Sequence, residues 1–327
     1  MQYTQLLAAD KKSSFPTWYK VVGSVVMALA VAGLIWWQFS SYGSSLGKVH
    51  EVWAGMSLVS SWYVWAICVI LMVINWSAEA GKWHYLARRV TPLSFFEAFR
   101  GVLSGLSLNA VLPHFLGDYA GRISAVKHRH RFRLVGGLWI GHVTQMAITC
   151  FAGAYGLALF INYYFPHFPV VSIAVAGVAI TLLSLALIMS SLPRFIRIFG
   201  RSKAGLFLKT AHQFDKSDWV VALAFSAARY ICFSLQFLLL LNLLGLQLSL
   251  HLQIAGITWV YLIKSWAPAI NIVADLGIRE VAALAFFPLF GADPAIIVAS
   301  GLSVWFLNLF VPGIIGAASL IRMPACR

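Results

Sequence analysis

Charged residues are scarce in this 327-residue chain, and acidic residues are the scarcest. Charged side chains make up 10% of the sequence, with 10 aspartates and glutamates against 24 lysines and arginines. Soluble domains carry roughly 25% charged residues, so this composition excludes an ordinary soluble domain. Hydrophobic residues reach 61%. We therefore predict an all-α integral membrane protein in which residues 1–327 form a single polytopic membrane domain.

The chain also has little cysteine and none of the common catalytic motifs. Its four cysteines show no metal-binding spacing, and none lies in a predicted external loop. There is no glycine-rich phosphate loop followed by lysine, no His-Glu-x-x-His and no serine elbow. The net charge of +14 is explained by the basic loops of a membrane protein. We expect no enzymatic activity, no cofactor, no metal site and no nucleic-acid partner.

Long apolar runs are abundant. Six are long enough to cross a bilayer core of roughly 30 Å, at residues 21–39, 58–78, 134–161, 170–191, 219–243 and 295–320. Two further apolar stretches, 91–126 and 250–290, are interrupted by helix-breaking residues. The six runs predict six spanning helices, and the two interrupted stretches need a separate explanation.

Basic residues gather in alternate loops, which predicts the topology. They precede the first run, follow the second, precede the third, follow the fourth and end the chain, whereas the opposite loops hold only Lys48. Because positively charged loops stay in the cytoplasm, we expect a multi-pass protein of the cytoplasmic (inner) membrane with both termini inside. In this interpretation Lys82, Arg88 and Arg89 are loop residues that follow the second run.

The same charge bias constrains the two interrupted stretches. Basic loops flank 91–126 on both sides and uncharged loops flank 250–290, so each stretch must leave the membrane on the side where it entered. Each arm has about 13–18 residues, short of the roughly 20 that a span needs, which favours two re-entrant helical hairpins over eight or more full spans. The expected hairpin breaks are Asn109, Pro113 and Gly117, then Pro268, Asn271 and Gly277.

The order span, span, hairpin, span occurs twice along the chain. Each half then crosses the membrane an odd number of times, so the second half is inverted relative to the first. We predict an inverted repeat with halves at approximately 20–165 and 166–322. Broken backbone at membrane depth is tolerated only where it is buried in protein or lines a watery cavity, so this arrangement implies a cavity.

Each hairpin carries an aspartate and an arginine separated by one helical turn. These are Asp118 with Arg122 and Asp275 with Arg279. The two members of each pair share a helix face and can neutralise one another. An arginine beside the N-terminus of a half-helix also forms an anion site, and its planar fork suits phosphate. The sequence leaves both interpretations open, and they are compatible.

Three further charges fall in apolar surroundings. Glu280 points about 100° away from Arg279 on a helix, so it is a candidate for a titrating or cation-contacting group. Lys264 lies on the entering arm of the second hairpin, where we expect a cavity or an acidic partner. Arg229 lies in the fifth run, and snorkelling toward an interface is an alternative to a role in binding.

The motifs resemble those of the transmembrane-region family of lysylphosphatidylglycerol synthetases, which includes the flippase half of the multiple peptide resistance factor and stand-alone relatives. The resemblance rests on Leu112-Pro113…Gly117-Asp118…Arg122, on the Arg229 region, on Pro268…Gly277-Ile278-Arg279-Glu280 and on the closing stretch 305–316. It covers most of the chain from about residue 20. The family often has glutamate at the position of Asp118 and a glycine-rich turn at 271–275. No aminoacyl-transferase domain accompanies these motifs, so the resemblance implies lipid translocation rather than lysine transfer.

We therefore expect this chain to translocate an anionic or zwitterionic phospholipid, or a lipid-linked precursor, with the head group held between the two hairpin tips. The phosphate would be bound by Arg122, Arg279, Lys264 and Arg229. Charge balance or proton coupling would fall to Asp118, Asp275 and Glu280. Membrane lipids are the expected partners. The alternatives are a small-solute or ion-coupled transporter, and a non-transporting scaffold for an envelope-lipid biosynthetic enzyme.

Overall fold

The computed structural model describes residues 47–56, 58–109, 114–124, 126, 134–199, 211, 213–267 and 272–321. Throughout these residues the regular structure is helical, which confirms the all-α prediction. The expected first span at 21–39 lies outside the described residues. The other five expected spans are each found as a long apolar helix, so this is a multi-pass membrane protein.

Five long rods form the frame of the part of the chain that the structure describes. Four are single helices: α4 (Leu58–Arg88), α7 (Leu134–Tyr164), α8 (Val170–Phe199) and α10 (Lys216–Leu243). The fifth combines α13 (Pro294–Trp305), the π-helical turn η3 (Phe306–Phe310) and α14 (Val311–Ile321). At 1.5 Å per residue, a helix of about 30 residues is roughly 45 Å long, enough to cross a membrane.

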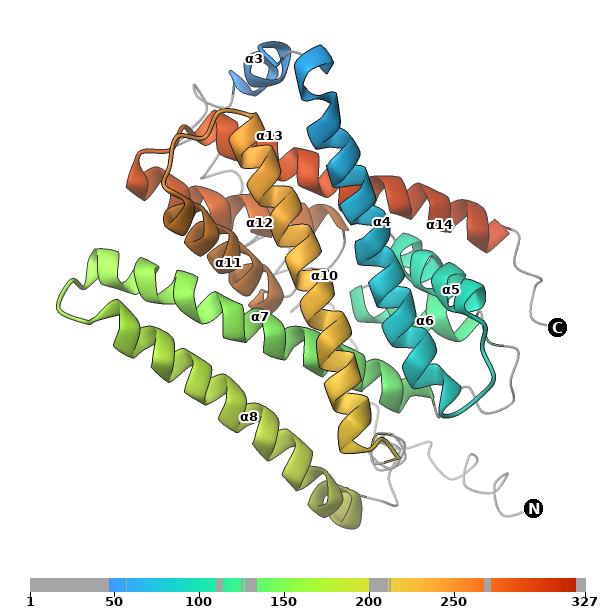
Figure 1. Ribbon diagram of the computed structural model, residues 1–327. Coiled ribbons are helices and arrows are strands. Elements are labelled where there is room, and N and C mark those ends of the chain that lie inside the picture. The colour runs from blue at the N-terminus through green and yellow to red at the C-terminus, as the bar shows by residue number, and fades with distance from the viewer. Residues whose placement is uncertain are drawn as a thin grey trace, which may run out of the picture.

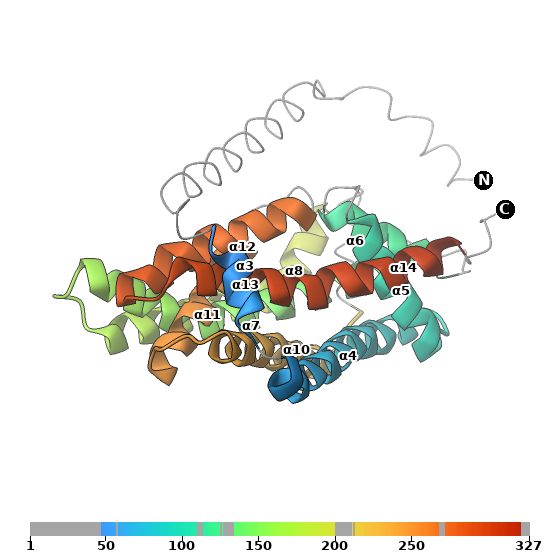
Figure 2. The same ribbon diagram turned by 90° about the horizontal axis from the view of Figure 1, so that it is seen from above.

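The helix α4 extends ten residues beyond its predicted end, which corrects the assignment of Lys82 to a loop. Lys82 lies inside α4 and only 2% of its surface is exposed. Figures 1 and 2 show that α4 and α10 lie side by side along most of their length. The apolar run stopped at Ala78 because polar residues follow it, but Glu79 and Lys82 among them are buried against neighbouring helices rather than exposed to water.

The two interrupted stretches each form a pair of short helices. The first pair is α5 (Phe95–Leu108) and α6 (His114–Ser124), and the second is α11 (Leu250–Trp266) and α12 (Ile272–Phe286), with the short turn η2 (Phe287–Phe290) after it. A capping box of Ser94 and Glu97 fixes the start of α5. The helix α5 packs against both α6 and α14, and Figure 1 shows α5 beside α14.

The structure corrects two of the six predicted hairpin breaks. Gly117 lies within α6 and Gly277 lies within α12, so neither interrupts a helix. Asn109 is the residue that ends α5. The remaining three, Pro113, Pro268 and Asn271, lie outside the described residues. Gly117 has a packing role instead, because a Cβ atom there would collide with the side-chain oxygen of Asn109.

Glycine lets the two arms of the first hairpin touch along their backbones. A Cβ atom at Gly121 of α6 would overlap the backbone nitrogen and Cα of Gly105 in α5. Backbone atoms cannot move aside as a flexible side chain can. The close crossing of α5 and α6 therefore depends on the absence of a side chain at Gly121.

We expect Gly121→Ala to lower the free energy of unfolding by at least about 2 kcal/mol, because the added methyl group must push the two helices apart. The matched control is Gly313→Ala in α14, where a Cβ atom would meet nothing within 4 Å. That change should be neutral or slightly stabilising, since alanine favours helix. Thermal denaturation in detergent measures both variants, and equal melting temperatures would contradict the crossing.

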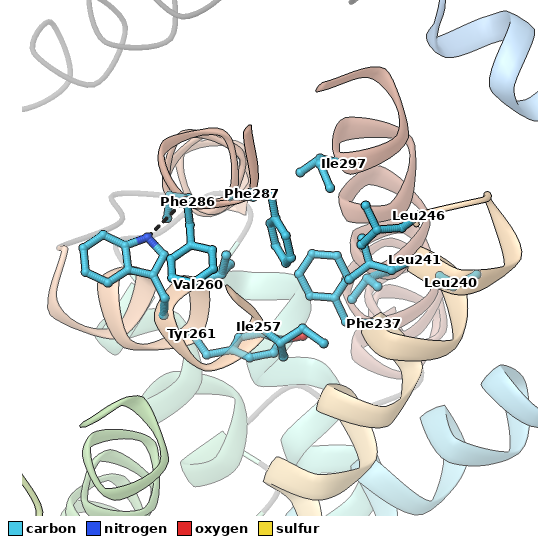
Figure 3. Packing of buried hydrophobic residues seen from close by; sticks show 14 of the residues in the cluster. Phe237, Leu240, Leu241, Leu246, Ile257, Val260, Tyr261, Phe286, Phe287 and Ile297 are labelled. Atoms are coloured by element: carbon cyan, nitrogen blue, oxygen red, sulfur yellow. Dashed lines mark hydrogen bonds between the residues drawn. The ribbon is translucent and has the colours of Figure 1, made fainter. Parts of the chain in front are cut away.

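The main apolar core joins α10, α11, α12 and α13. Figure 3 shows the rings of Phe237 and Phe287 at its centre, with Ile297 and Leu241 beside them. A hydrogen bond from the Trp259 indole to the carbonyl of Ala282, 2.9 Å long, ties α11 to α12 in the same region. This packing holds the second hairpin rigidly against α10 and α13.

Two helices lie at the periphery. The short helix α3 (Val49–Ala54) packs against α13. The helix α8 packs along α7 at the edge of the molecule in Figure 1, and no residue in its most apolar window is buried. An apolar surface of this kind is what a lipid-facing helix requires. The charged residues discussed below are instead enclosed by the other helices.

Candidate functional site

Three polar residues of α4 form the base of the site. Asn75, Glu79 and Lys82 follow one another at intervals of four and three residues, so they project from one face of the helix. Glu79 is only 4% exposed and Lys82 2%. An acid and a lysine in the low-dielectric interior of a membrane protein require partners, because an isolated charge there is costly.

Glu79 binds cations from three helices at once. Its Oε1 accepts a hydrogen bond from Arg122 Nη2 of α6 at 2.8 Å. Its Oε2 accepts from Arg229 Nη1 of α10 at 2.8 Å and is 2.9 Å from Lys82 Nζ in its own helix. The alternative that Arg229 snorkels toward an interface is therefore not seen, because its guanidinium turns inward to a buried carboxylate.

Asp118 completes this group from α6. Its Oδ1 accepts from Arg122 Nε at 2.8 Å, one helical turn along, and its Oδ2 is 3.2 Å from Nε2 of His142 in α7. The predicted Asp118–Arg122 pair is thus confirmed as an ion pair, and Arg122 joins it to Glu79. We call Glu79, Lys82, Asp118, Arg122 and Arg229 the Glu79 network.

A chain of amides extends the network toward the π-helical turn. Arg229 Nε donates to Asn75 Oδ1 at 3.0 Å, and Asn75 Nδ2 donates to Asn308 Oδ1 at 3.1 Å. Asn308 Nδ2 in turn donates to Gln236 Oε1 of α10 at 2.9 Å. Asn308 lies in η3, a π-helical turn of the kind that often marks functional positions.

A second group of charges lies on the second hairpin. Asp275 of α12 has its Oδ1 3.1 Å from Lys264 Nζ of α11, and its Oδ2 accepts from Arg279 Nη2 at 3.1 Å. The Arg279 guanidinium also lies over the ring of Tyr261, 5.7 Å from its centre. The predicted Asp275–Arg279 pair is confirmed. For Lys264 the sequence predicted a cavity or an acidic partner, and the structure shows the acidic partner.

Glu280 has no such partner among the described residues. Both of its carboxylate oxygens are buried and accept no hydrogen bond there. It faces α13 at Gly301, where a Cβ atom would overlap Oε1 of Glu280. A buried carboxylate without donors is unfavourable. Glu280 is therefore set apart from the ion pair beside it, as its position on the helix predicted.

The structure gathers the predicted charges into two groups rather than one. Asp118, Arg122 and Arg229 belong to the Glu79 network, whereas Lys264, Asp275 and Arg279 form the pair of bridges on the second hairpin. Chemically, each group offers guanidinium and ammonium donors next to carboxylates. The cations of such a group can bind an anion in place of their carboxylates. A carboxylate that loses its cation can then bind a proton or another cation.

Sequence reasoning missed Glu79 and Lys82. Both follow directly after a long apolar run, where charges ordinarily mark the end of a membrane span. The signal that would have found them is the spacing of Asn75, Glu79 and Lys82, which puts three polar residues on one face of a helix that otherwise stays apolar.

The sequence comparisons agree with this architecture. Residues 21–316 match the family described as the lysylphosphatidylglycerol synthase transmembrane region. No curated protein matches the chain. The matched region contains every residue of both charge groups, and it extends over more than half of the sequence. The chain is thus a multi-pass membrane protein related to lipid handling, and it belongs to the lysylphosphatidylglycerol synthase transmembrane-region family.

Proposed function

We propose that this protein translocates phospholipids, or lipid-linked precursors with a similar head group, between the two leaflets of the cytoplasmic membrane. The observation that supports this most strongly is the pair of buried charge groups, one at each helical hairpin, in a family related to lipid handling. A phosphate head group needs cationic donors if it is to pass through an apolar bundle, and both groups provide them.

In this proposal the hairpins α5–α6 and α11–α12 are re-entrant and enter from opposite faces of an inverted repeat. With about 14 and 11 residues, α5 and α6 would be roughly 21 Å and 17 Å long, short of the bilayer core. Both termini would lie in the cytoplasm, because the basic loops do. The chain would act as a transporter without catalysing a reaction, and its partners would be membrane lipids.

The cations would bind the phosphate and the acids would hold those cations in place between transport events. Lys264 is the most accessible of the cations, with 27% of its side chain exposed, followed by Arg229 with 21%. Asp275 binds both Lys264 and Arg279, so it stays paired with Arg279 if Lys264 moves away. Lys264 can therefore leave Asp275 for a head-group phosphate without making Asp275 an unpaired buried acid.

We expect Lys264→Gln to slow lipid exchange about tenfold, because the substitution removes one charge-assisted hydrogen bond to the phosphate. The assay uses purified protein in liposomes that contain tail-labelled lipid and a membrane-impermeant reagent that bleaches only the outer leaflet. Wild type should allow well over half of the label to be bleached. The control Lys48→Gln, at an exposed position before α3, should leave the rate unchanged.

Two outcomes would count against the proposal. If wild-type protein leaves the inner leaflet protected for every phospholipid class, the protein does not translocate lipid and a scaffold role is favoured. If Lys264→Gln and Lys48→Gln behave alike while wild type is active, Lys264 has no part in binding the head group.

A further inference from the structure

The Glu79 network contains one more positive charge than negative charge. Its cations are Lys82, Arg122 and Arg229, and its acids are Glu79 and Asp118. These five side chains together carry a net charge of +1. On the second hairpin, Lys264 and Arg279 stand against Asp275, and the Glu280 carboxylate lies apart from them without a hydrogen-bond donor among the described residues. The Glu79 network therefore carries a surplus positive charge of its own.

Lys82 is the cation most nearly enclosed. Besides Glu79 its ammonium donates to two neutral oxygens, the carbonyl of Gly141 and the hydroxyl of Ser226, each at 3.3 Å. These contacts use all three of its donors without adding a negative charge. Since Glu79 also has to neutralise Arg122 and Arg229, one positive charge of the network remains uncompensated in a low-dielectric interior.

A small cavity lies next to this charge. It is lined by Glu79 and Lys82 of α4, by Arg122 of α6, and by Gly137, Gly141 and His142 of α7. Its volume is about 10 Å³, close to the space that one water molecule requires. It is too small for a phosphate group. A phosphate therefore fits into this cavity only if the helices that line it, α4, α6 and α7, separate.

We propose that the Glu79 network selects lipid head groups whose net charge is negative, with a phosphodiester as the single charged group. This inference rests on the proposed function of lipid translocation and names its substrate class. A monoanionic phosphodiester would bring the charge of the occupied network to zero. A zwitterionic head group brings its own ammonium among three cations, and an aminoacylated head group brings a net positive charge, so both are disfavoured.

The test measures exchange of three lipids in proteoliposomes, each labelled on an acyl chain so that the head group is native. They are phosphatidylglycerol, phosphatidylethanolamine and lysylphosphatidylglycerol, which carry net charges of −1, 0 and +1 at neutral pH. We expect wild type to exchange the anionic lipid at least tenfold faster than either of the others. Glycerol phosphate added in solution should not compete, because a soluble anion lacks the membrane anchor that brings the head group to the bundle.

Charge-tuned variants then link the preference to the network. Lys82→Gln removes the surplus charge and should reduce the preference for the anionic lipid to threefold or less. Lys82→Arg keeps the charge and should keep the preference, and so should the exposed control Lys48→Gln. If Lys82→Gln does not fold, Arg229→Gln removes the same charge from the more accessible edge of the network and replaces it in the test.

The outcomes separate the two proposals. Exchange of the zwitterionic or cationic lipid as fast as the anionic one would overturn the charge selection but leave translocation intact, and inhibition by glycerol phosphate would assign the site to a soluble phosphate. Absence of exchange for all three lipids would overturn translocation. Native mass spectrometry would then still decide the inference: anionic lipid should be retained on wild type and lost from Lys82→Gln, and equal retention would overturn it.

Discussion

Replacing Glu79 by glutamine is expected to abolish the stable fold under conditions in which the wild-type protein is well behaved. The carboxylate of Glu79 accepts from Arg122, Arg229 and Lys82, which come from three different helices. A neutral amide cannot compensate these three cations. Removing one partner of a buried ion pair costs about 3–5 kcal/mol, and here three cations lose the same partner. We expect a large fall in the melting temperature and loss of the single size-exclusion peak in detergent.

Two controls separate this effect from a general sensitivity to the substitution. Glu51→Gln makes the same chemical change on the exposed face of α3 and should be neutral. The double variant Glu79→Gln/Lys82→Met restores the original net charge of the network, so it should be more stable than Glu79→Gln alone. A Glu79→Gln protein as stable as wild type would show that the network does not hold α4, α6 and α10 together.

Replacing Glu280 by glutamine should reduce lipid exchange to the rate of protein-free liposomes while the protein remains folded. Both oxygens of this carboxylate are buried without a hydrogen-bond donor among the described residues, next to Gly301. Nothing there would be lost on changing the acid to an amide of the same shape. If Glu280 carries a proton or contacts a cation during transport, however, the substitution by glutamine removes that role completely. The bleaching assay gives the rate, and thermal denaturation shows whether the fold survives.

The neighbouring glycine provides a second way to disturb Glu280. A Cβ atom at Gly301 would overlap the Glu280 carboxylate, so Gly301→Ala should displace that group and slow exchange while every titratable side chain remains. Gly313→Ala is again the control, because its position is open. Normal exchange by Glu280→Gln would remove Glu280 from the mechanism. Normal exchange by Gly301→Ala alone would mean that the position of the carboxylate is not critical.

Several features could be predicted because they depend on residues close together in the chain. The spacing of four between Asp118 and Arg122 places both on one side of a helix, whatever that helix packs against. The same holds for Asp275 and Arg279. The breaks of the two hairpins were also predicted, although Gly117 and Gly277 proved to be helical. Glycine lowers helix stability only modestly, so tertiary contacts can keep it in a helix.

The partners of Arg229 and Lys82 could not be predicted in the same way. Arg229 meets Glu79 across 150 positions of the sequence, and Ser226 meets Lys82 across 144. A charge near the end of an apolar run has the same sequence appearance whether it faces water or a neighbouring helix. Only the packing of α10 against α4 distinguishes the two cases, and here it makes Lys82 an interior residue.

The sequence by itself determined that this protein is a helical, multi-pass membrane protein with two interrupted segments and paired charges within them. Hydrophobic length and helical spacing are local properties, because a bilayer requires each segment to satisfy its own backbone. The tertiary structure alone decided that Glu79 joins three cations and that Glu280 lies against Gly301 with no hydrogen-bond partner among the described residues. Those contacts arise where helices remote in sequence cross, and the small glycine side chains fix how closely they approach.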